Sequence, residues 1–260
     1  MNRQGYMLIA LGQKYIDEAE MFVKTLRQQN DNRPVSVLIK TEEKQYAEDK
    51  NIFNDLVEFN PVTKFYKHCT VDFEKFGTYP KINLIRYSRY KENIFVDTDV
   101  LCQTSTEKLW DFLSNRKNPV ASMGTKTDPN WHWGHINEVS EKFGRPVPHI
   151  HGGFLYFRNS ASDFFDSCDR LAYRYDELGC KRLFRGGMCD EIIFALAHAE
   201  NNYLPIEFDE FPIMTFNYST DIELPSKLQT HNNKELEDYI PFIHMCDRTN
   251  IKKIFKKIMK

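Results

Sequence analysis

Two aspartates, Asp97 and Asp99, are separated by one residue and follow directly on the strand-like run 93–96. Carboxylates at positions i and i+2 beyond the end of a strand can both turn toward one ion. Burying them beside a core strand is costly unless a cation compensates their charge. A hard divalent cation such as Mg²⁺ or Mn²⁺ suits such oxygens and neutralises phosphate charge. The pair therefore predicts a metal site, the alternative being a solvated turn.

The elements that must position this pair are strands and helices in alternation. An apolar run of strand length at 6–11 precedes a stretch with apolar residues at three- and four-residue steps, and further strand-like runs lie at 35–39 and 56–59. This order is typical of an α/β fold with a mostly parallel central sheet flanked by helices. Such sheets bind ligands at the carboxyl ends of their strands, where Asp97 and Asp99 fall.

The rest of the chain continues this pattern with one long interruption. The region 123–151 has the composition of a loop, and the sequence shows no repeat and no obvious linker. A single compact domain over residues 1–247 is expected, followed by a basic amphipathic helix at 248–260. Further elements are predicted as helices at 81–90, 162–178 and 189–199 and a strand at 154–157.

Composition narrows the class of protein. The chain has 260 residues, 14% aromatic residues and a formal net charge of −2, which argues against an overall basic surface for nucleic acid. The first apolar stretch is too short for a signal-peptide core or a membrane span, so a cytoplasmic location is expected. Six cysteines without a CxxC pair are interpreted as free thiols.

A loop rich in aromatic and imidazole groups offers a second chemical feature. Sugars and bases stack on flat rings, so the loop is a candidate wall for an acceptor substrate, while ordinary loop packing is the alternative. A separate metal site is a weaker interpretation because no zinc-type spacing occurs. The residues concerned are Trp131, His132, Trp133, His135, Pro146, Pro148, His149 and His151.

Two further residues carry alternatives. Lys81 is interpreted as a compact charge directed at phosphates, or as an ordinary surface lysine. Asp190 follows Gly186 and Gly187 at the start of a predicted helix, where it could cap the helix or bind a substrate hydroxyl.

The last ten residues place apolar side chains on one helical face and lysines on the other. A basic amphipathic helix suits the anionic inner surface of a membrane, so peripheral membrane contact is one expectation. Packing of the apolar face on the domain is another, and contact with nucleic acid is the least favoured. The lysines are Lys252, Lys253, Lys256, Lys257 and Lys260.

Four blocks, in order, resemble the retaining family 8 glycosyltransferases. Ile9 to Tyr15 is similar to the opening strand and turn of that family, and the resemblance implies that Ala10, Leu11, Gly12 and Tyr15 hold a uridine. The segment from Lys81 to Asp97-Thr98-Asp99 is similar to the family's basic residue and D-x-D motif.

The third and fourth blocks concern the sugar and the metal. His151-Gly152-Gly153-Phe154 resembles the family's Asn-Ser-Gly turn, and Asp190-Glu191 resembles its Asp-Gln pair, so the resemblance implies that Gly152, Gly153, Asp190 and Glu191 lie at the donor sugar. Phe242-Ile243-His244 is similar to the segment whose histidine is the third protein ligand of the metal.

The chain departs from the family after His244. The usual glycine and phosphate-binding lysine are missing, and Arg248 or Lys252 is a candidate replacement for the lost charge. The family's Asn-Ser-Gly turn is replaced here by His-Gly-Gly, and its Gln by Glu191. These replacements leave the identity of the donor sugar open.

The resemblance implies a GT-A fold and a Mn²⁺- or Mg²⁺-dependent transfer of a sugar from a nucleotide-sugar donor, with UDP expected and with retention of configuration. The acceptor would be a saccharide, a lipid-linked sugar or another hydroxyl compound. Alternatives are a transferase acting on modified DNA bases and a non-catalytic nucleotide-sugar-binding protein. A nucleotidyltransferase is disfavoured because Leu11-Gly12-Gln13-Lys14 is a poor glycine-rich phosphate loop.

Overall fold

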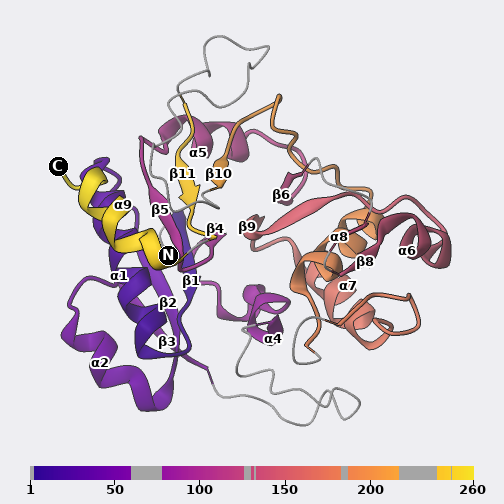
Figure 1. Cartoon of the computed structure of the whole chain (residues 1–260), viewed down its shortest axis with the longest axis horizontal. Helices are drawn as coiled ribbons and strands as arrows, with labels where there is room; N and C mark the ends of the chain where they lie inside the picture. Colours follow the sequence, from indigo (N-terminus) through magenta and orange to yellow (C-terminus); the bar gives the residue numbers. More distant parts are fainter. Residues whose placement is uncertain are drawn as a thin grey trace.

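A mixed six-stranded sheet forms the centre of the molecule (Figure 1). The computed structural model describes residues 3–59, 78–125, 130–131, 133–182, 187–216, 239–246 and 248–260. The strand order is β3-β2-β1-β4-β9-β6, in which β3, β2, β1 and β4 are parallel and β9 runs antiparallel to both β4 and β6. The strands are β1 (Gln4–Ile9), β2 (Val35–Lys40), β3 (Asp55–Phe59), β4 (Glu92–Val96), β6 (Val120–Gly124) and β9 (Ile150–Arg158).

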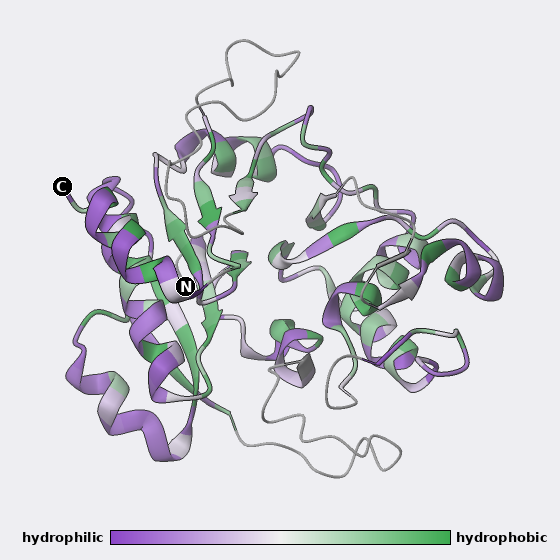
Figure 2. Ribbon diagram, in the orientation of Figure 1, coloured by the Kyte–Doolittle hydropathy of each residue, from purple (hydrophilic) through white to green (hydrophobic). Residues whose placement is uncertain are grey.

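Helices cover both faces of this sheet because the strands bury side chains in both directions. Tyr6 and Leu8 of β1 pack with α1 (Gln13–Gln28), α2 (Lys44–Asp49) and α5 (Glu107–Ser114). Met7 points to the other face, where α6 (Ile136–Phe143), α7 (Ser162–Tyr173) and α8 (Asp190–Asn201) lie. Figure 2 shows the central strands coloured largely as hydrophobic, as expected for a sheet covered on both sides.

A smaller three-stranded sheet brings the end of the chain to the end of β4. It has the order β10-β11-β5 and consists of β10 (Met214–Phe216), β11 (Phe242–His244) and β5 (Val100–Cys102). Strand β11 runs antiparallel to β5, with His244 opposite Val100. Because β5 begins one residue after Asp99, this register places His244 beside that aspartate.

The C-terminal helix α9 (Ile251–Ile258) follows a 3-10 turn at Arg248–Asn250 and lies along α1 (Figure 1). Ile251 and Ile254 are buried with Leu101, Ile243 and Met245. The expectation that the apolar face packs on the domain is therefore confirmed for these two residues. The five lysines of the tail are exposed. No helix in the described part of the chain is long and apolar enough to cross a bilayer.

Two sequence-based predictions of secondary structure were wrong. The segment 81–90 is not one helix but a short helix α4 (Thr78–Lys81) and a 3-10 turn at Leu84–Tyr87. Asn83 lies between them with a non-helical backbone, and its side-chain amide donates to the carbonyl of Tyr79 at 3.1 Å, which ends the helix.

The region 123–151 contains the helix α6 and a two-stranded hairpin of β7 (Asn130–Trp131) and β8 (Gly134–His135), not only loop. Ile136 and Val139 of α6 are buried, and Gly144 ends the helix at a positive φ of 82°. The three-residue apolar spacing was present in the sequence, but the surrounding tryptophans, histidines and prolines obscured it. The predicted helix at 162–178 ends earlier, at Tyr173.

Candidate functional site

Asp97, Asp99 and His244 lie together at the carboxyl end of β4. One ligand atom from each falls within 4.8 Å of the others, and they are the one such group among the described residues. Two backbone hydrogen bonds hold the aspartate turn, from Asp97 N to Gly153 O at 3.2 Å and from Val100 N to Asp97 O at 3.2 Å. His244 is fixed from the neighbouring sheet, where the next residue donates its amide to the carbonyl of Asp99 at 2.8 Å.

The charges at this centre are strongly coupled. His244 Nε2 lies 3.1 Å from Asp99 Oδ1, and Arg248 Nε donates to Asp99 Oδ2 at 2.8 Å. Burial lowers the pKa of His244, but its hydrogen bond with Asp99 more than offsets this and raises the pKa to about 10. Burial raises the pKa of Asp99, but His244 and Arg248 outweigh it, so its pKa lies below the usual value. Without a metal, the imidazolium and the guanidinium neutralise the carboxylate.

The three side chains fit a divalent cation by chemistry and by distance. Two carboxylate oxygens and one imidazole nitrogen form a mixed donor set of the kind that hard or borderline divalent ions accept. A metal requires the neutral imidazole, so binding would displace the proton that Asp99 stabilises on His244. Arg248 would then be released from part of its pairing with Asp99.

Lys81 joins the first aspartate to the start of α8. Its Nζ atom lies 2.9 Å from Asp97 Oδ1 and 2.7 Å from Asp190 Oδ2. Burial lowers the pKa of Lys81, but Asp190 and Asp97 more than compensate and hold it above its ordinary value. Burial raises the pKa of Asp97, and Lys81 opposes that rise. Lys81 is buried, so the surface interpretation is wrong. Asp190 does not cap α8, whose cap residue is Cys189 without a side-chain hydrogen bond.

Gly152 and Gly153 leave space that no side chain could share. A Cβ at Gly152 would lie 2.8 Å from Asp190 Oδ2 and 3.4 Å from the Cβ of Glu191. A Cβ at Gly153 would lie 2.6 Å from the His151 ring and 3.2 Å from Asp97 Oδ2. The glycine pair therefore allows β9 to pass between Asp190 on one side and Asp97 on the other.

The turn after β1 is connected to Asp99 through Arg248. Ala10 is buried and donates its amide to Leu38 O at 2.8 Å, and Gly12 has a φ of 137° that favours glycine. The guanidinium of Arg248 lies 5.1 Å from the centroid of the Tyr15 ring. Arg248 thus links this turn, with Leu11 partly buried beside it, to the candidate metal centre.

Sequence reasoning missed Glu18, a buried carboxylate on α1. It accepts a hydrogen bond from the Thr98 hydroxyl at 3.0 Å, and Arg248 Nη1 lies 3.4 Å from the same oxygen. Burial raises the pKa of Glu18, although Arg248 and Thr98 oppose the rise. The available signal was a glutamate among the apolar positions of the helix, next to Ala19.

The residues predicted to form an acceptor wall lie in different places in the structure. Trp133 is 1% exposed and lies in the core, so the prediction that it offers a stacking surface to an acceptor is wrong. His151 packs against the rings of His244 and Phe216, with centroids 4.9 and 4.7 Å apart, at the edge of the candidate metal centre. His149 lies 5.9 Å from Trp133, ring centroid to ring centroid. The side chain of Trp131 and all of His132 lie outside the described residues.

A sheet of this topology with paired aspartates at the end of a central strand defines the GT-A class of sugar transferases. The profile of glycosyl transferase family 8 matches residues 7–173, well over half of the chain. The protein belongs to this family and is a glycosyltransferase.

Solved structures agree on the fold. Mouse xyloside xylosyltransferase 1 in its apo form superimposes with a TM-score of 0.63 at 9% identity, covering 96% of this chain and 99% of that one. The galactosyltransferase LgtC, in complex with donor and acceptor sugar analogues, gives 0.62 at 13% identity, covering 98% and 95%. The bifunctional glycosyltransferase WbbM gives 0.62 at 13% identity, covering 99% of this chain and 50% of that one. A search of curated proteins finds no significant match.

Proposed function

We propose that the chain transfers a sugar from a UDP-sugar to a hydroxyl acceptor, with retention of configuration and with Mn²⁺ as the metal. The observation that carries this proposal is the convergence of Asp97, Asp99 and His244 at the carboxyl end of β4. Family membership supports the reaction class, and the donor set supports a divalent cation. In this proposal residues 1–247 form one catalytic domain.

Asp97, Asp99 and His244 would hold the cation, which supplies positive charge to the departing diphosphate when it is bound. The backbone of Ala10, Leu11 and Gly12 and the ring of Tyr15 would hold the nucleoside beside them. Thr98 contributes by fixing Glu18, through the hydrogen bond of 3.0 Å between their side chains. Arg248, which pairs with Asp99, would be free to bind phosphate if that carboxylate held a cation.

Asp190 and Glu191 would face the donor sugar across the space left by Gly152 and Gly153. Lys81 orients Asp190, because its ammonium lies 2.7 Å from one carboxylate oxygen. A carboxylate held in this way can accept hydrogen bonds from sugar hydroxyls and stabilise positive charge that develops at the anomeric carbon. The acceptor would be a saccharide or a lipid-linked sugar.

The test combines metal, donor and variants in one experiment. Wild-type protein with Mn²⁺ and a panel of nucleotide sugars should hydrolyse or transfer one donor, and the Asp97→Asn variant should lose about a hundredfold or more in kcat/KM. Asp111→Asn, an exposed carboxylate on α5, is the matched control and should behave as wild type. Unchanged turnover in Asp97→Asn would refute the proposal, and binding without any turnover would select the non-catalytic alternative.

A further inference from the structure

Glu18 is a carboxylate on α1 that is only 3% exposed. Its Oε2 atom accepts a hydrogen bond from the Thr98 hydroxyl at 3.0 Å, and Arg248 Nη1 lies 3.4 Å from the same atom. The largely exposed Lys14 lies 3.9 Å from Oε1. Burying a carboxylate is costly unless partners compensate its charge. Because Thr98 precedes Asp99 in the chain and Arg248 bonds to Asp99, these partners connect Glu18 to the candidate metal centre.

The guanidinium of Arg248 is shared between two carboxylates. Its Nε atom donates to Asp99 Oδ2 at 2.8 Å, Nη1 faces Glu18, and the group lies 5.1 Å from the centroid of the Tyr15 ring. Nη2 has no hydrogen-bond partner among the described residues, and the side chain is 33% exposed. Arg248 therefore keeps donors that an anionic ligand at the edge of the centre could use.

The backbone is held on both sides of Arg248. Met245 donates its amide to the carbonyl of Asp99 at 2.8 Å, and Ile251, 4% exposed, packs against the domain. Any change of partner must therefore come from the long side chain of Arg248. A cation that neutralises Asp99 weakens the attraction between Arg248 and that carboxylate. Glu18 is then the remaining carboxylate, among the contacts of Arg248 described here, that can hold the guanidinium.

We propose that Glu18 is a positioning residue that holds Arg248 in place to bind the diphosphate of the donor. This inference rests on the proposed function and adds to it a residue that neither binds the metal nor touches the donor. By its charge alone, an acidic residue near a diphosphate would weaken binding of that ligand. Positioning has the opposite sign. Without Glu18 the flexible side chain of Arg248 loses its anchor, and the ligand must then order that side chain on binding.

Titration calorimetry of the full chain with UDP in excess Mn²⁺ tests this sign. Glu18→Gln should weaken UDP binding about tenfold, the effect of losing a hydrogen bond to a charged group. The amide oxygen of glutamine can still accept from the Thr98 hydroxyl, so the turn that carries Asp99 keeps its contact. Binding of Mn²⁺ alone, followed by the EPR signal of the ion, should therefore be unchanged.

Glu20→Gln is the matched control, because it makes the same change on the same helix. Glu20 pairs with Lys24 and Lys50 instead of Arg248, so this variant should bind UDP as wild type does. Arg248→Gln should weaken UDP binding at least as much as Glu18→Gln. The double variant should bind UDP no more weakly than Arg248→Gln, since both changes remove the same guanidinium contact.

Unchanged or tighter UDP binding by Glu18→Gln would overturn the inference. So would additive losses in the double variant, or a loss of Mn²⁺ binding as large as the loss of UDP binding. If the thermal melt shows that Glu18→Gln does not fold, Glu18→Asp supplies the test. It keeps the charge but withdraws it from Arg248 by one methylene, and it should again bind UDP more weakly than wild type. If wild type binds neither Mn²⁺ nor UDP, the proposed function itself has failed.

Discussion

Gly153 is the residue at which added volume would act most directly on the candidate metal centre. A Cβ there would lie 2.6 Å from the His151 ring and 3.2 Å from Asp97 Oδ2, so one of them must move. Gly153 also accepts the amide of Asp97, which ties the strand to the first predicted ligand. Its importance follows from crowding around the chain and not from an unusual backbone angle.

We therefore expect Gly153→Ala to raise the Mn²⁺ concentration required for half-maximal activity by about tenfold, because a small displacement of a ligand weakens coordination. Metal titrations of activity and of Mn²⁺ binding would measure this. Gly124→Ala is the control, since the three atoms nearest to its Cβ would all belong to the carboxylate of the exposed Glu207, which can move away. Equal metal requirements in both variants would contradict the role given to Gly153.

His198 gives a residue-scale prediction about stability and pH. It is completely buried, with Nε2 2.8 Å from Ser122 Oγ and Nδ1 3.1 Å from the carbonyl of Tyr203. Burial lowers the pKa of His198 from 6.5 to about 4. Below pH 6.5 the unfolded chain takes up a proton that the folded chain does not, so this contribution to stability is complete above pH 6.5. It is lost as the pH falls toward 4.

Between pH 7 and pH 4.5, His198 should account for a loss of about 2 kcal/mol in the free energy of unfolding. Urea denaturation of wild type and His198→Gln at both pH values would measure it. Carboxylates titrate in the same range, so the informative quantity is the difference between the two slopes. If the variant lost as much stability as wild type over this range, the assignment to His198 would be wrong.

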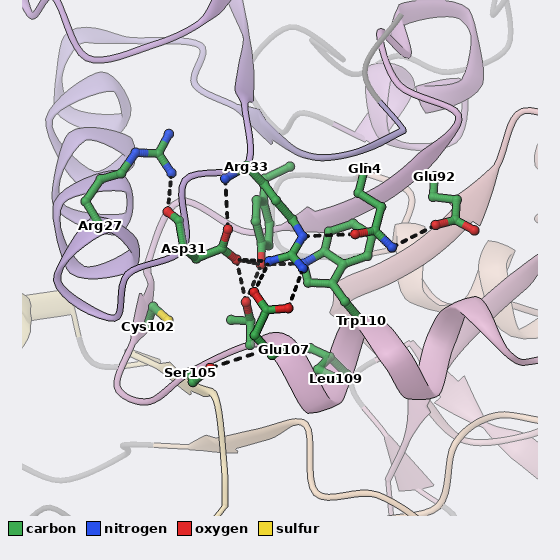
Figure 3. A network of polar contacts seen from close by, with 12 residues as sticks. Gln4, Arg27, Asp31, Arg33, Glu92, Cys102, Ser105, Glu107, Leu109 and Trp110 are labelled. Carbon is green, nitrogen blue, oxygen red and sulfur yellow. Dashed lines mark hydrogen bonds and ion pairs between the residues drawn. The ribbon is translucent and has the colours of Figure 1, made fainter.

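At the scale of elements, a polar network fastens the amino ends of the strands (Figure 3). Asp31, in the connection from α1 to β2, accepts hydrogen bonds from the Tyr6 hydroxyl at 2.6 Å and from the Thr106 hydroxyl. The guanidinium of Arg33 lies 3.1 Å from the same carboxylate and makes a bidentate pair with Glu107. One buried aspartate thereby joins β1, the start of β2 and the start of α5.

Asp31→Ala should lower the free energy of unfolding by about 3–5 kcal/mol, because it leaves buried donors and a guanidinium without their partner. Glu107→Gln, which alters the exposed end of the same network, should cost less than about 1 kcal/mol. Denaturant unfolding of both variants measures the difference. Since Asp31 lies at the edge of the sheet opposite Asp97, the folded Asp31→Ala protein should keep its affinity for Mn²⁺, and a large loss would contradict this separation.

At the scale of the whole molecule, α9 turns two faces to different surroundings. Ile251 and Ile254 are buried against the domain, whereas the five lysines of the tail are exposed. Figure 2 shows hydrophilic colouring along the outer side of this helix. A membrane contact through α9 would therefore be mainly electrostatic, with Met259, 36% exposed, as the apolar contribution beyond it.

We predict that the protein binds vesicles containing anionic phosphatidylserine and not vesicles of neutral phosphatidylcholine. Reversing the charge of Lys256 and Lys257 to Glu should weaken binding by more than tenfold, since each lysine near the surface contributes about 1 kcal/mol. Lys91→Glu with Lys117→Glu is the control with the same change of net charge at exposed positions elsewhere. Sedimentation with vesicles at low and high salt measures binding. Equal loss in both double variants, or tighter binding to duplex DNA than to vesicles, would contradict a membrane role for α9.

The sequence by itself determined the features that depend on local pattern. Alternating apolar runs and helical periods predicted β1, α1, β2, β3 and β4, because strands buried on both faces must be continuously apolar. The position of Asp97 and Asp99 directly after β4 predicted a site at the carboxyl edge of the sheet. Resemblance to a family added His244, which no spacing could have indicated.

The tertiary structure alone decided which distant residues meet. His244 reaches Asp99 across 145 positions because β11 pairs with β5, and Lys81 reaches both Asp97 and Asp190 because α4 and α8 converge on the end of β4. Glu18 stood out in the sequence only by its place among apolar positions of α1, and since a carboxylate on a helix is usually solvated, its contacts with Thr98 and Arg248 could not be predicted. Such contacts join residues that are far apart in the sequence. The local periodicity of apolar residues does not show which distant segments pack together.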